Sequence, residues 1–311
     1  MHGFNNRLAI IIPTKDRPAE LAQSLKGLSG QSVLPLQIVI VDGGESPVLE
    51  ILTGFSGLNM TYLRSRPATA SGQRNKGLKA VDAGIDFVGF LDDDVKLPEN
   101  AIEAMMDFWK DAADSVGGAA FNLVNIPRHT KVRFESSSFA ERLGLYSAKP
   151  GELLSSGFHT MIDRVDRLRH VRWLPGGASV WRKAALGNDP FDERLGAYSY
   201  LEDIDLSYRV GKEFEFFVIP EAKYYHHEAS NSRINRYRYG QKVVVNRLYF
   251  VRKHKEFSLW KCYIALLVRF GITLARALRR RNAEEFQLAL GNVIGFAKSF
   301  ILSKDEIRNL G

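Results

Sequence analysis

The chain has 311 residues, of which 45% are hydrophobic and 25% charged, a composition typical of a globular protein with a sizeable core. Its single cysteine, Cys262, excludes an intrachain disulfide and favours a reducing compartment. The net charge of +8 is uneven, because residues 233–281 hold fourteen Lys and Arg side chains and one acid, Glu256. Such a segment favours an anionic partner, either nucleic acid or membrane lipid.

The first 125 residues alternate short apolar runs with amphipathic segments, the pattern of strands and helices in an α/β protein. The strands are predicted at residues 8–12, 38–41, 60–63, 88–91 and 116–122. The helices are predicted at residues 19–28, 71–83 and 98–111. Ser71 is the expected N-cap of the second helix, and Pro98 is the expected first residue of the third. The alternation predicts a mostly parallel sheet with helices on both faces.

The pattern weakens after residue 125 and becomes helical near the end of the chain. Residues 125–169 are interpreted as a long excursion and residues 191–199 as a loop. Two more strands are predicted at residues 171–174 and 214–219, followed by Tyr224, Tyr225, His226 and His227, and a helix is expected to open at Glu202. Long helices are then predicted from about residue 234, at residues 259–281 and at residues 283–302.

The last helices favour a surface role over a membrane span. The apolar run at residues 262–275 is too short, and too charged at its flanks, to span a bilayer. It suits a helix lying in the bilayer interface, and a helical hairpin packed on the catalytic core is the alternative. The first seven residues lack a basic region followed by an apolar run, so no secretory signal is expected.

Polar residues follow three of the predicted strands, at residues 14–17, at Asp42 and at residues 92–94. In α/β sheets ligands bind beyond the carboxyl ends of the strands, so we expect these groups along one rim. In extended backbone, Asp92 and Asp94 point to the same side while Asp93 faces elsewhere. Neighbouring carboxylates repel one another, and a divalent cation with oxygen ligands is their natural partner. A merely solvated acidic corner is the alternative.

Several motifs occur together in an order that resembles a known family. They are the apolar run at residues 8–13, Asp42, residues 74–77, residues 92–94, Gly176-Gly177 and Glu202-Asp203. This set resembles family 2 inverting glycosyltransferases over roughly residues 7–230. The resemblance implies the GT-A type of α/β fold, a nucleotide-diphospho-sugar donor, Mg²⁺ or Mn²⁺, and sugar transfer to a hydroxyl with inversion. We therefore expect a catalytic domain at residues 1–230 and a basic, amphipathic helical region at residues 231–311.

The resemblance also assigns roles to individual residues. Asp94 and His226 would bind the metal, and the spacing from the preceding strand favours His226 over His227. Asp203 would be the catalytic base, with Glu202 as its likeliest substitute. The donor-binding residues would be Pro13, Thr14, Asp16, Asp42, Arg74, Asn75, Asp92 and Asp93. The acceptor-binding residues would be Gly176, Gly177 and Trp173.

Other interpretations of these residues stay open. Acids in the first turn of a helix offset its dipole, which would account for Glu202 and Asp203 without catalysis. The two histidines could be surface residues, Arg74 could pair with an acid, Gly176-Gly177 could be only a turn, and Trp173 could belong to the core. The family often has two acids after the second strand, whereas Gly43-Gly44 follows Asp42 here, so base recognition is in doubt.

Competing functions are disfavoured by what the sequence lacks. A nucleotidyltransferase normally has a Gly-rich, basic loop after its first strand, and residues 13–18 contain no glycine. A nucleic-acid binder would fit the pI of 9.5, but the basic residues are confined to one segment and an acidic rim repels phosphate. No G-x-x-x-x-G-K-[ST] motif occurs, which excludes a P-loop enzyme. The sequence therefore predicts a metal-dependent glycosyltransferase for a glycan or lipid-linked acceptor in cell-surface polysaccharide synthesis, cytoplasmic and peripheral on the inner face of the membrane.

Overall fold

The computed structural model describes residues 7–125, 138–196, 200–226 and 235–301. The chain divides into two compact units, and each is described by itself. The first unit comprises Met1–Pro127, Asp163–Glu193 and Glu202–Ala229. The second comprises Arg128–Ile162, Arg194–Leu201 and Ser230–Gly311. Compactness alone does not show which segment folds independently, so the expected domains at residues 1–230 and 231–311 stay a prediction.

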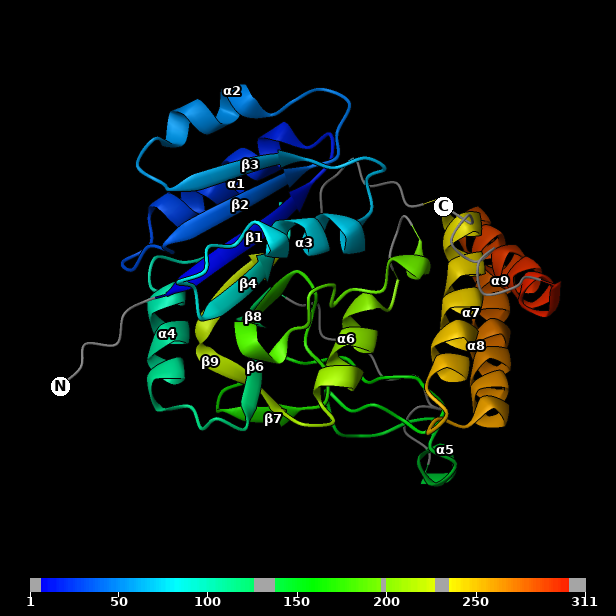
Figure 1. Ribbon diagram of the computed structural model, residues 1–311. Helices are drawn as coiled ribbons and strands as arrows, with labels where there is room; N and C mark the ends of the chain where they lie inside the picture. The colour runs from blue at the N-terminus through cyan, green and yellow to red at the C-terminus, as the bar shows by residue number, and fades with distance from the viewer. Residues whose placement is uncertain (1–6, 126–137, 197–199, 227–234, 302–311) are drawn as a thin grey trace. The chain divides into compact units, whose positions relative to one another are not determined.

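The described part of the first unit is built on a nine-stranded mixed sheet (Figure 1). Its strands are β1 Leu8–Thr14, β2 Gln37–Asp42, β3 Met60–Arg64, β4 Phe87–Leu91, β5 Val95–Lys96, β6 Val116–Leu123, β7 Arg169–Val171, β8 Ala178–Arg182 and β9 Glu215–His226. The order is β3-β2-β1-β4-β8-β6-β9-β5, and β7 also pairs with β9. Strands β1 to β4 are parallel, whereas β8 runs antiparallel to both β4 and β6.

Helices cover both faces of this sheet. They are α1 Pro18–Ser29, α2 Leu49–Leu52, α3 Ala70–Lys79, α4 Ala101–Asp111 and α6 Glu202–Val210. Ile10 and Ile12 of β1 share a buried core with Leu25 of α1 and Met105 of α4. Helix α3 packs against β1 and β2. The predicted α/β architecture is confirmed, because buried apolar runs such as β1 need cover on both sides.

Several predicted boundaries are wrong for identifiable reasons. Helix α3 begins at Ala70 because the side chain of Thr69, not Ser71, accepts the Gly72 N–H at 3.1 Å, and it ends at Lys79 instead of residue 83. Helix α4 begins at Ala101, three residues after Pro98. The strand expected at residues 171–174 is β7, which ends at Val171.

The strand expected at residues 214–219 is much longer than predicted. As β9 it continues through a register shift against β6 and ends at His226, so Tyr224, Tyr225 and His226 lie on the strand and not beyond it. The loop expected at residues 191–199 contains a short 3₁₀ helix, Glu193–Leu195, and two others are Thr53–Phe55 and Lys183–Ala185. Residues 126–137 of the expected excursion, residues 197–199 and His227 lie outside the described residues.

The described part of the second unit is helical. Its helices are α5 Ser138–Arg142, α7 Arg236–Lys253, α8 Leu259–Arg280 and α9 Ala283–Ile301. The three long helices confirm the helical character predicted from about residue 234 onward, and residues 234 and 302 lie outside the described part. None of the helices in the described ranges has a long enough weakly charged apolar stretch to cross a bilayer.

Candidate active site

The acidic triplet forms a turn between β4 and β5. Strand β4 ends at Leu91, and the Val95 N–H closes the turn on the Asp92 carbonyl at 3.2 Å. Strand β5 then pairs antiparallel with β9, which sets Val95 opposite His226. The ligand atoms of Asp92, Asp94 and His226 consequently lie within 4.8 Å of one another. The predicted convergence of Asp92 and Asp94 is therefore present, but it is produced by a turn instead of an extended strand.

These three residues fit a divalent cation. Asp94 Oδ1 lies 3.0 Å from His226 Nε2, and the side chains of Asp92 and His226 are both more than one-third exposed. Two carboxylates and an imidazole are a donor set that suits Mn²⁺, and carboxylates also suit Mg²⁺. Among the described residues, these three form a candidate metal-binding group at the carboxyl edge of the sheet. Assignment of Asp94 and His226 as ligands stays a prediction.

Asp93 faces the strand β1 instead. The Thr14 hydroxyl donates to Asp93 Oδ2 at 2.8 Å, and Arg17 Nη1 lies 3.2 Å from Oδ1. Arg17 also reaches Asp94 Oδ2 at 3.3 Å. Burial raises the pKa of Asp93 to about 6, although Thr14 and Arg17 oppose that rise. Asp93 therefore fastens the acidic turn to the end of β1, and its predicted contact with a donor stays a prediction.

Arg74 connects the acidic turn to helix α6. Its Nη2 donates to Asp92 Oδ1 at 2.6 Å, and its Nη1 donates to Glu202 Oε1. The Ser71 hydroxyl donates to Glu202 Oε2 at 2.6 Å. Burial raises the pKa of Glu202, and Arg74 and Ser71 work against it. Each Glu202 oxygen is thus already bonded within the protein, which suits a residue that positions others.

Asp203 lies at the opening of α6 beside the glycine pair. Its Oδ1 accepts the Ile204 N–H at 2.8 Å. Burial raises the pKa of Asp203, whereas the Ile204 amide, Arg74 and the Gly176 amide lower it. A Cβ on Gly176 would stand 3.4 Å from the Asp203 Cβ, and a Cβ on Gly177 would overlap the Asp92 carboxylate. Gly177 therefore allows the backbone to approach Asp92 closely, whereas Gly176 is in ordinary contact distance of Asp203.

Two further predicted site residues have structural partners. Asn75 Nδ2 donates to the Phe191 carbonyl at 2.8 Å, and its Oδ1 accepts the Phe191 N–H at 2.9 Å, so this side chain clamps α3 to the segment before α6. Trp173 is 5% exposed and its ring offers little surface for stacking, which agrees with the core interpretation. Their donor and acceptor roles are untested predictions.

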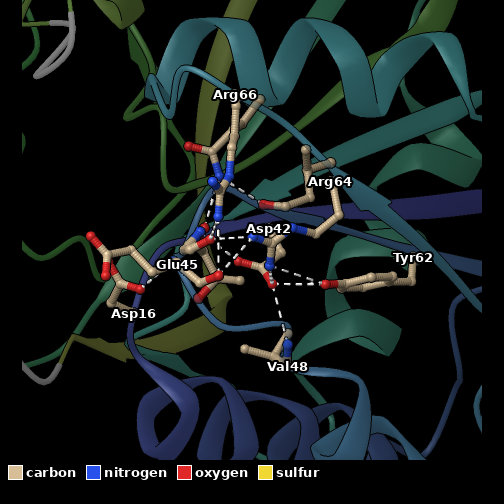
Figure 2. A network of polar contacts seen from close by, with 11 residues as sticks. Asp16, Asp42, Glu45, Val48, Tyr62, Arg64 and Arg66 are labelled. Carbon is tan, nitrogen blue, oxygen red and sulfur yellow. Dashed lines mark hydrogen bonds and ion pairs between the residues drawn. The ribbon is translucent and has the colours of Figure 1, made fainter.

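Asp42 lies at the centre of a polar network at the end of β2 (Figure 2). Its buried carboxylate accepts the Gly44 and Val48 N–H groups at 2.7 and 3.2 Å, the Tyr62 hydroxyl at 2.8 Å and Arg64 Nη1 at 2.6 Å. These bonds fold the loop after β2 around the end of β3. Asp42 has no exposed surface, so a direct contact with a base or ribose would require these bonds to change.

The loop after β2 is held from two more sides. Asp16 Oδ1 accepts the Glu45 N–H at 2.7 Å, and Asp16 adopts a left-handed backbone with φ of 53°. Arg66 Nη2 donates to the carbonyls of Gly44 and Glu45 at 3.1 and 3.0 Å (Figure 2). Pro13 and Thr14 end β1 on the same rim, since Thr14 is in register with Asp42. The predicted gathering of strand-end residues is therefore present in the structure.

The sequence interpretation missed three residues that build this rim: Arg64, Arg66 and Ser71. Arg17 belongs to the segment 14–17 that was expected on the rim, but its pairing with Asp93 and Asp94 was not predicted. Arg64 is the last residue of β3, the third strand of the parallel set, and Arg66 follows it, so their position at a strand end was a usable signal. Ser71 was identified as a cap, and its bond to Glu202, 131 positions away, had no signal in the sequence.

Comparison with known proteins supports a single family. Residues 9–165, half of the chain, match the family model described as glycosyl transferase family 2. Over 273 residues the chain is 24% identical to the minor teichoic acid biosynthesis protein GgaA of Bacillus subtilis, covering 84% of this chain and 54% of GgaA. The chain thus spans about half the length of that relative.

A second relative and a solved structure are similar over most of the chain. The N-acetylglucosaminyl-diphospho-decaprenol L-rhamnosyltransferase of Mycobacterium tuberculosis is 26% identical over 249 residues, which are 72% of this chain and 77% of that protein. The mannosyltransferase PcManGT of Pyrobaculum calidifontis, solved with GDP-Man and Mn²⁺, superposes with a TM-score of 0.54 at 13% identity, covering 94% of this chain and 87% of that one. From its sequence and its fold together, the chain belongs to glycosyl transferase family 2 and has the GT-A architecture of glycosyltransferases.

Proposed function

We propose that this chain transfers a sugar from a nucleotide-diphosphate donor to a hydroxyl of a glycan or lipid-linked acceptor, with inversion, in cell-surface polysaccharide synthesis. The observation that carries the proposal is the convergence of Asp92, Asp94 and His226, with Asp92 against Gly177 and Asp203 beside the neighbouring Gly176. A candidate cation site and a half-buried carboxylate are thereby adjacent. Inverting sugar transfer needs both groups close to one reacting carbon.

The proton acceptor in this proposal is Asp203. Its carboxylate removes the proton of the acceptor hydroxyl while that oxygen bonds to the anomeric carbon, and the bond from this carbon to the donor diphosphate breaks. The raised pKa of Asp203 makes it a stronger base than an exposed aspartate. Glu202 is a poorer candidate because Arg74 and Ser71 already occupy its two oxygens.

Asp92, Asp94 and His226 would hold the divalent ion. A bound Mg²⁺ or Mn²⁺ would neutralise the negative charge that develops on the leaving diphosphate. The structurally similar PcManGT was solved in complex with GDP-Man and Mn²⁺, which supports a nucleotide-sugar donor and this type of ion here. Arg74 contributes by holding the Asp92 carboxylate in place at 2.6 Å.

We further propose that the reaction takes place in the cytoplasm at the inner face of the membrane. The basic segment at residues 233–281 supports an anionic surface as a partner. The name of the rhamnosyltransferase relative includes a diphospho-decaprenol substrate, which supports a lipid-linked acceptor.

A donor screen tests the proposal. The purified chain is heated with UDP-, GDP- and dTDP-sugars in the presence of Mn²⁺, and again after the metal is chelated with EDTA. We expect one nucleotide class to raise the melting temperature only when Mn²⁺ is present, and the same donor to release its nucleoside diphosphate on incubation. Asp203→Asn serves as the matched control, since it should keep the thermal shift and lose the release. The absence of a shift with every donor, in both Mn²⁺ and Mg²⁺, would contradict the proposal.

A further inference from the structure

Helices α8 and α9 carry an apolar side-chain row that the rest of the second unit does not cover. On α8 the exposed residues recur at helical spacing, at Trp260, Ile264, Leu267, Gly271, Ala275 and Leu278. On α9 the exposed row is Phe286, Leu290, Val293, Ala297 and Phe300. Steps of three, four and seven residues put each row on one face of its helix. We call the two rows together the apolar stripe.

The two rows form one continuous surface. Helices α8 and α9 lie side by side as an antiparallel hairpin (Figure 1), because Tyr263 near the start of α8 stacks on Phe296 and Phe300 near the end of α9. Tyr263 is 60° around α8 from Trp260, and Phe296 is about 80° around α9 from Phe286, at the 100° per residue of a helix. These contacts therefore lie between the two rows, and both rows face the same way.

The opposite side of α9 is packed against α7. A Cβ on Gly291 would overlap the Tyr237 carbonyl, and a Cβ on Gly240 would overlap the Leu288 carbonyl, so the two helices meet backbone to backbone. Gly291 and Gly295 point away from the row of Leu290 and Val293. The hairpin therefore packs on α7 through the face of α9 opposite the apolar stripe, and the stripe itself is left uncovered within the second unit.

The charges on α8 are all of one sign. From Leu259 to Arg281 there is no acidic residue, and the basic residues are Lys261, Arg269, Arg276, Arg279, Arg280 and Arg281. Lys261 and Arg279 flank the row on α8, where long side chains can reach past an apolar surface to anionic groups. On α9 the acids are Glu284, which is 3.4 Å from Arg236, and Glu285.

We infer that the apolar stripe docks into the surface of an anionic lipid bilayer, with the hairpin lying in the plane of the interface. Exposed apolar rows with Trp and Phe, flanked by Lys and Arg, match the chemistry of the boundary between acyl chains and headgroups. If a second copy of the chain covered the stripe through a two-fold contact, the basic flanks of the two copies would face each other. Their repulsion makes a second copy a poorer partner than an anionic bilayer. This inference names the protein surface that would hold the chain at the membrane. It rests on the proposed membrane location but does not require transferase activity.

Trp260 provides a direct reporter. It is 57% exposed, whereas the other three tryptophans, Trp109, Trp173 and Trp181, are at most 5% exposed. Mixing the chain with phosphatidylcholine vesicles that contain phosphatidylglycerol should therefore shift the emission to shorter wavelength, and the chain should sediment with the vesicles. Trp260→Phe should abolish the spectral shift while sedimentation persists. Vesicles of phosphatidylcholine alone should bind more weakly.

A matched pair of variants separates insertion from simple charge attraction. Leu290→Glu and Gln287→Glu add the same charge to exposed positions of α9, but only Leu290 belongs to the stripe. We expect Leu290→Glu to weaken vesicle binding about tenfold or more and Gln287→Glu to weaken it clearly less. Circular dichroism and donor-induced thermal shift of both variants check folding and the proposed function separately, so either proposal can fail alone.

Three results would overturn the inference. One is the absence of sedimentation with anionic vesicles at low salt. Another is equal weakening by Leu290→Glu and Gln287→Glu, which would assign the binding to charge alone. The third is a light-scattering measurement in which the wild-type chain is a dimer and Leu290→Glu is a monomer with unchanged vesicle binding, which would assign the stripe to a second copy.

Discussion

The Nη2 atom of Arg74 lies 2.6 Å from Oδ1 of Asp92, which ties helix α3 to the turn that carries the candidate metal ligands. The same guanidinium bonds Glu202, the residue before Asp203. Arg74 is 3% exposed, so both pairs are shielded from solvent on the arginine side. The candidate base and the candidate metal ligands are thereby held by one buried cation.

Removal of that cation should destabilise the fold. Arg74→Met leaves the buried Glu202 carboxylate without its partner, and we expect a loss of about 3–5 kcal/mol in the free energy of unfolding. Urea denaturation measures it. Lys79→Met on the same helix breaks the exposed pair with Asp189 and should cost less than about 1 kcal/mol. Equal losses in the two variants would show that the buried Arg74 pairs contribute no more to stability than an exposed ion pair.

Neutralising Glu202 at the same time should restore part of the stability. The double variant Arg74→Met with Glu202→Gln no longer buries an unpaired charge, so its loss should be smaller than the sum of the two single losses, with a coupling of about 0.5–3 kcal/mol. Additive losses would mean that the two side chains act independently.

Asp203→Asn should abolish transfer while donor binding survives. The amide cannot accept a proton, yet its oxygen can still accept the Ile204 N–H, so the local structure is kept. We expect turnover to fall by about 10²–10⁴-fold and the donor dissociation constant to stay near that of the wild type. Near-normal turnover would refute the assignment of the base. Glu202→Gln would then be the next variant to assay.

The acid side of the pH–rate profile should reflect the raised pKa of Asp203. Burial raises this pKa above the ordinary value of 3.8, and Arg74 works in the opposite direction. The base acts as a carboxylate, so activity is present above the raised pKa and is lost as pH falls through it. We expect the acid limb of kcat/KM above pH 3.8, with donor affinity measured over the same pH range to separate binding from catalysis. An acid limb at or below pH 3.8 would contradict Asp203 as the base.

The sequence predicted the rim because of a simple rule: parallel strands end on the same side. Thr14 and Asp42 end β1 and β2, the acidic turn follows β4, and these groups do lie together. The contacts of the individual rim residues were harder to predict from the sequence. His226 meets Asp94 because β5 pairs with β9, a contact across 132 positions that periodicity does not encode. Asp42 looked like an open strand-end acid, and its four internal bonds depend on how β3 and the following loop fold back.

The candidate metal site can be tested by removing single ligands. Asp94→Ala should abolish the Mn²⁺-dependent part of donor binding, because Asp94 contributes a carboxylate beside His226 at 3.0 Å. His226→Ala should weaken it, and Tyr225→Phe on the neighbouring position of β9 should not. Isothermal titration with donor, with Mn²⁺ and after EDTA treatment, measures the effect. Unchanged Mn²⁺ dependence in both ligand variants would place the ion elsewhere.

Asp42 and its arginine offer the clearest separation of structure from donor contact. The buried carboxylate lies 2.6 Å from Arg64 Nη1, and we expect Asp42→Ala to cost about 3–5 kcal/mol of folding free energy.

Arg66 bonds the carbonyls of the same loop without touching Asp42, so Arg66→Ala is the matched control for Arg64→Ala and should be milder. Chemical denaturation and donor titration are measured on all three variants. If the main role of Asp42 is to fold the loop, Asp42→Ala and Arg64→Ala should lose stability together, and donor affinity should fall in proportion. A loss of donor affinity in Asp42→Ala with stability intact would instead support the direct contact with base or ribose that the family resemblance predicts.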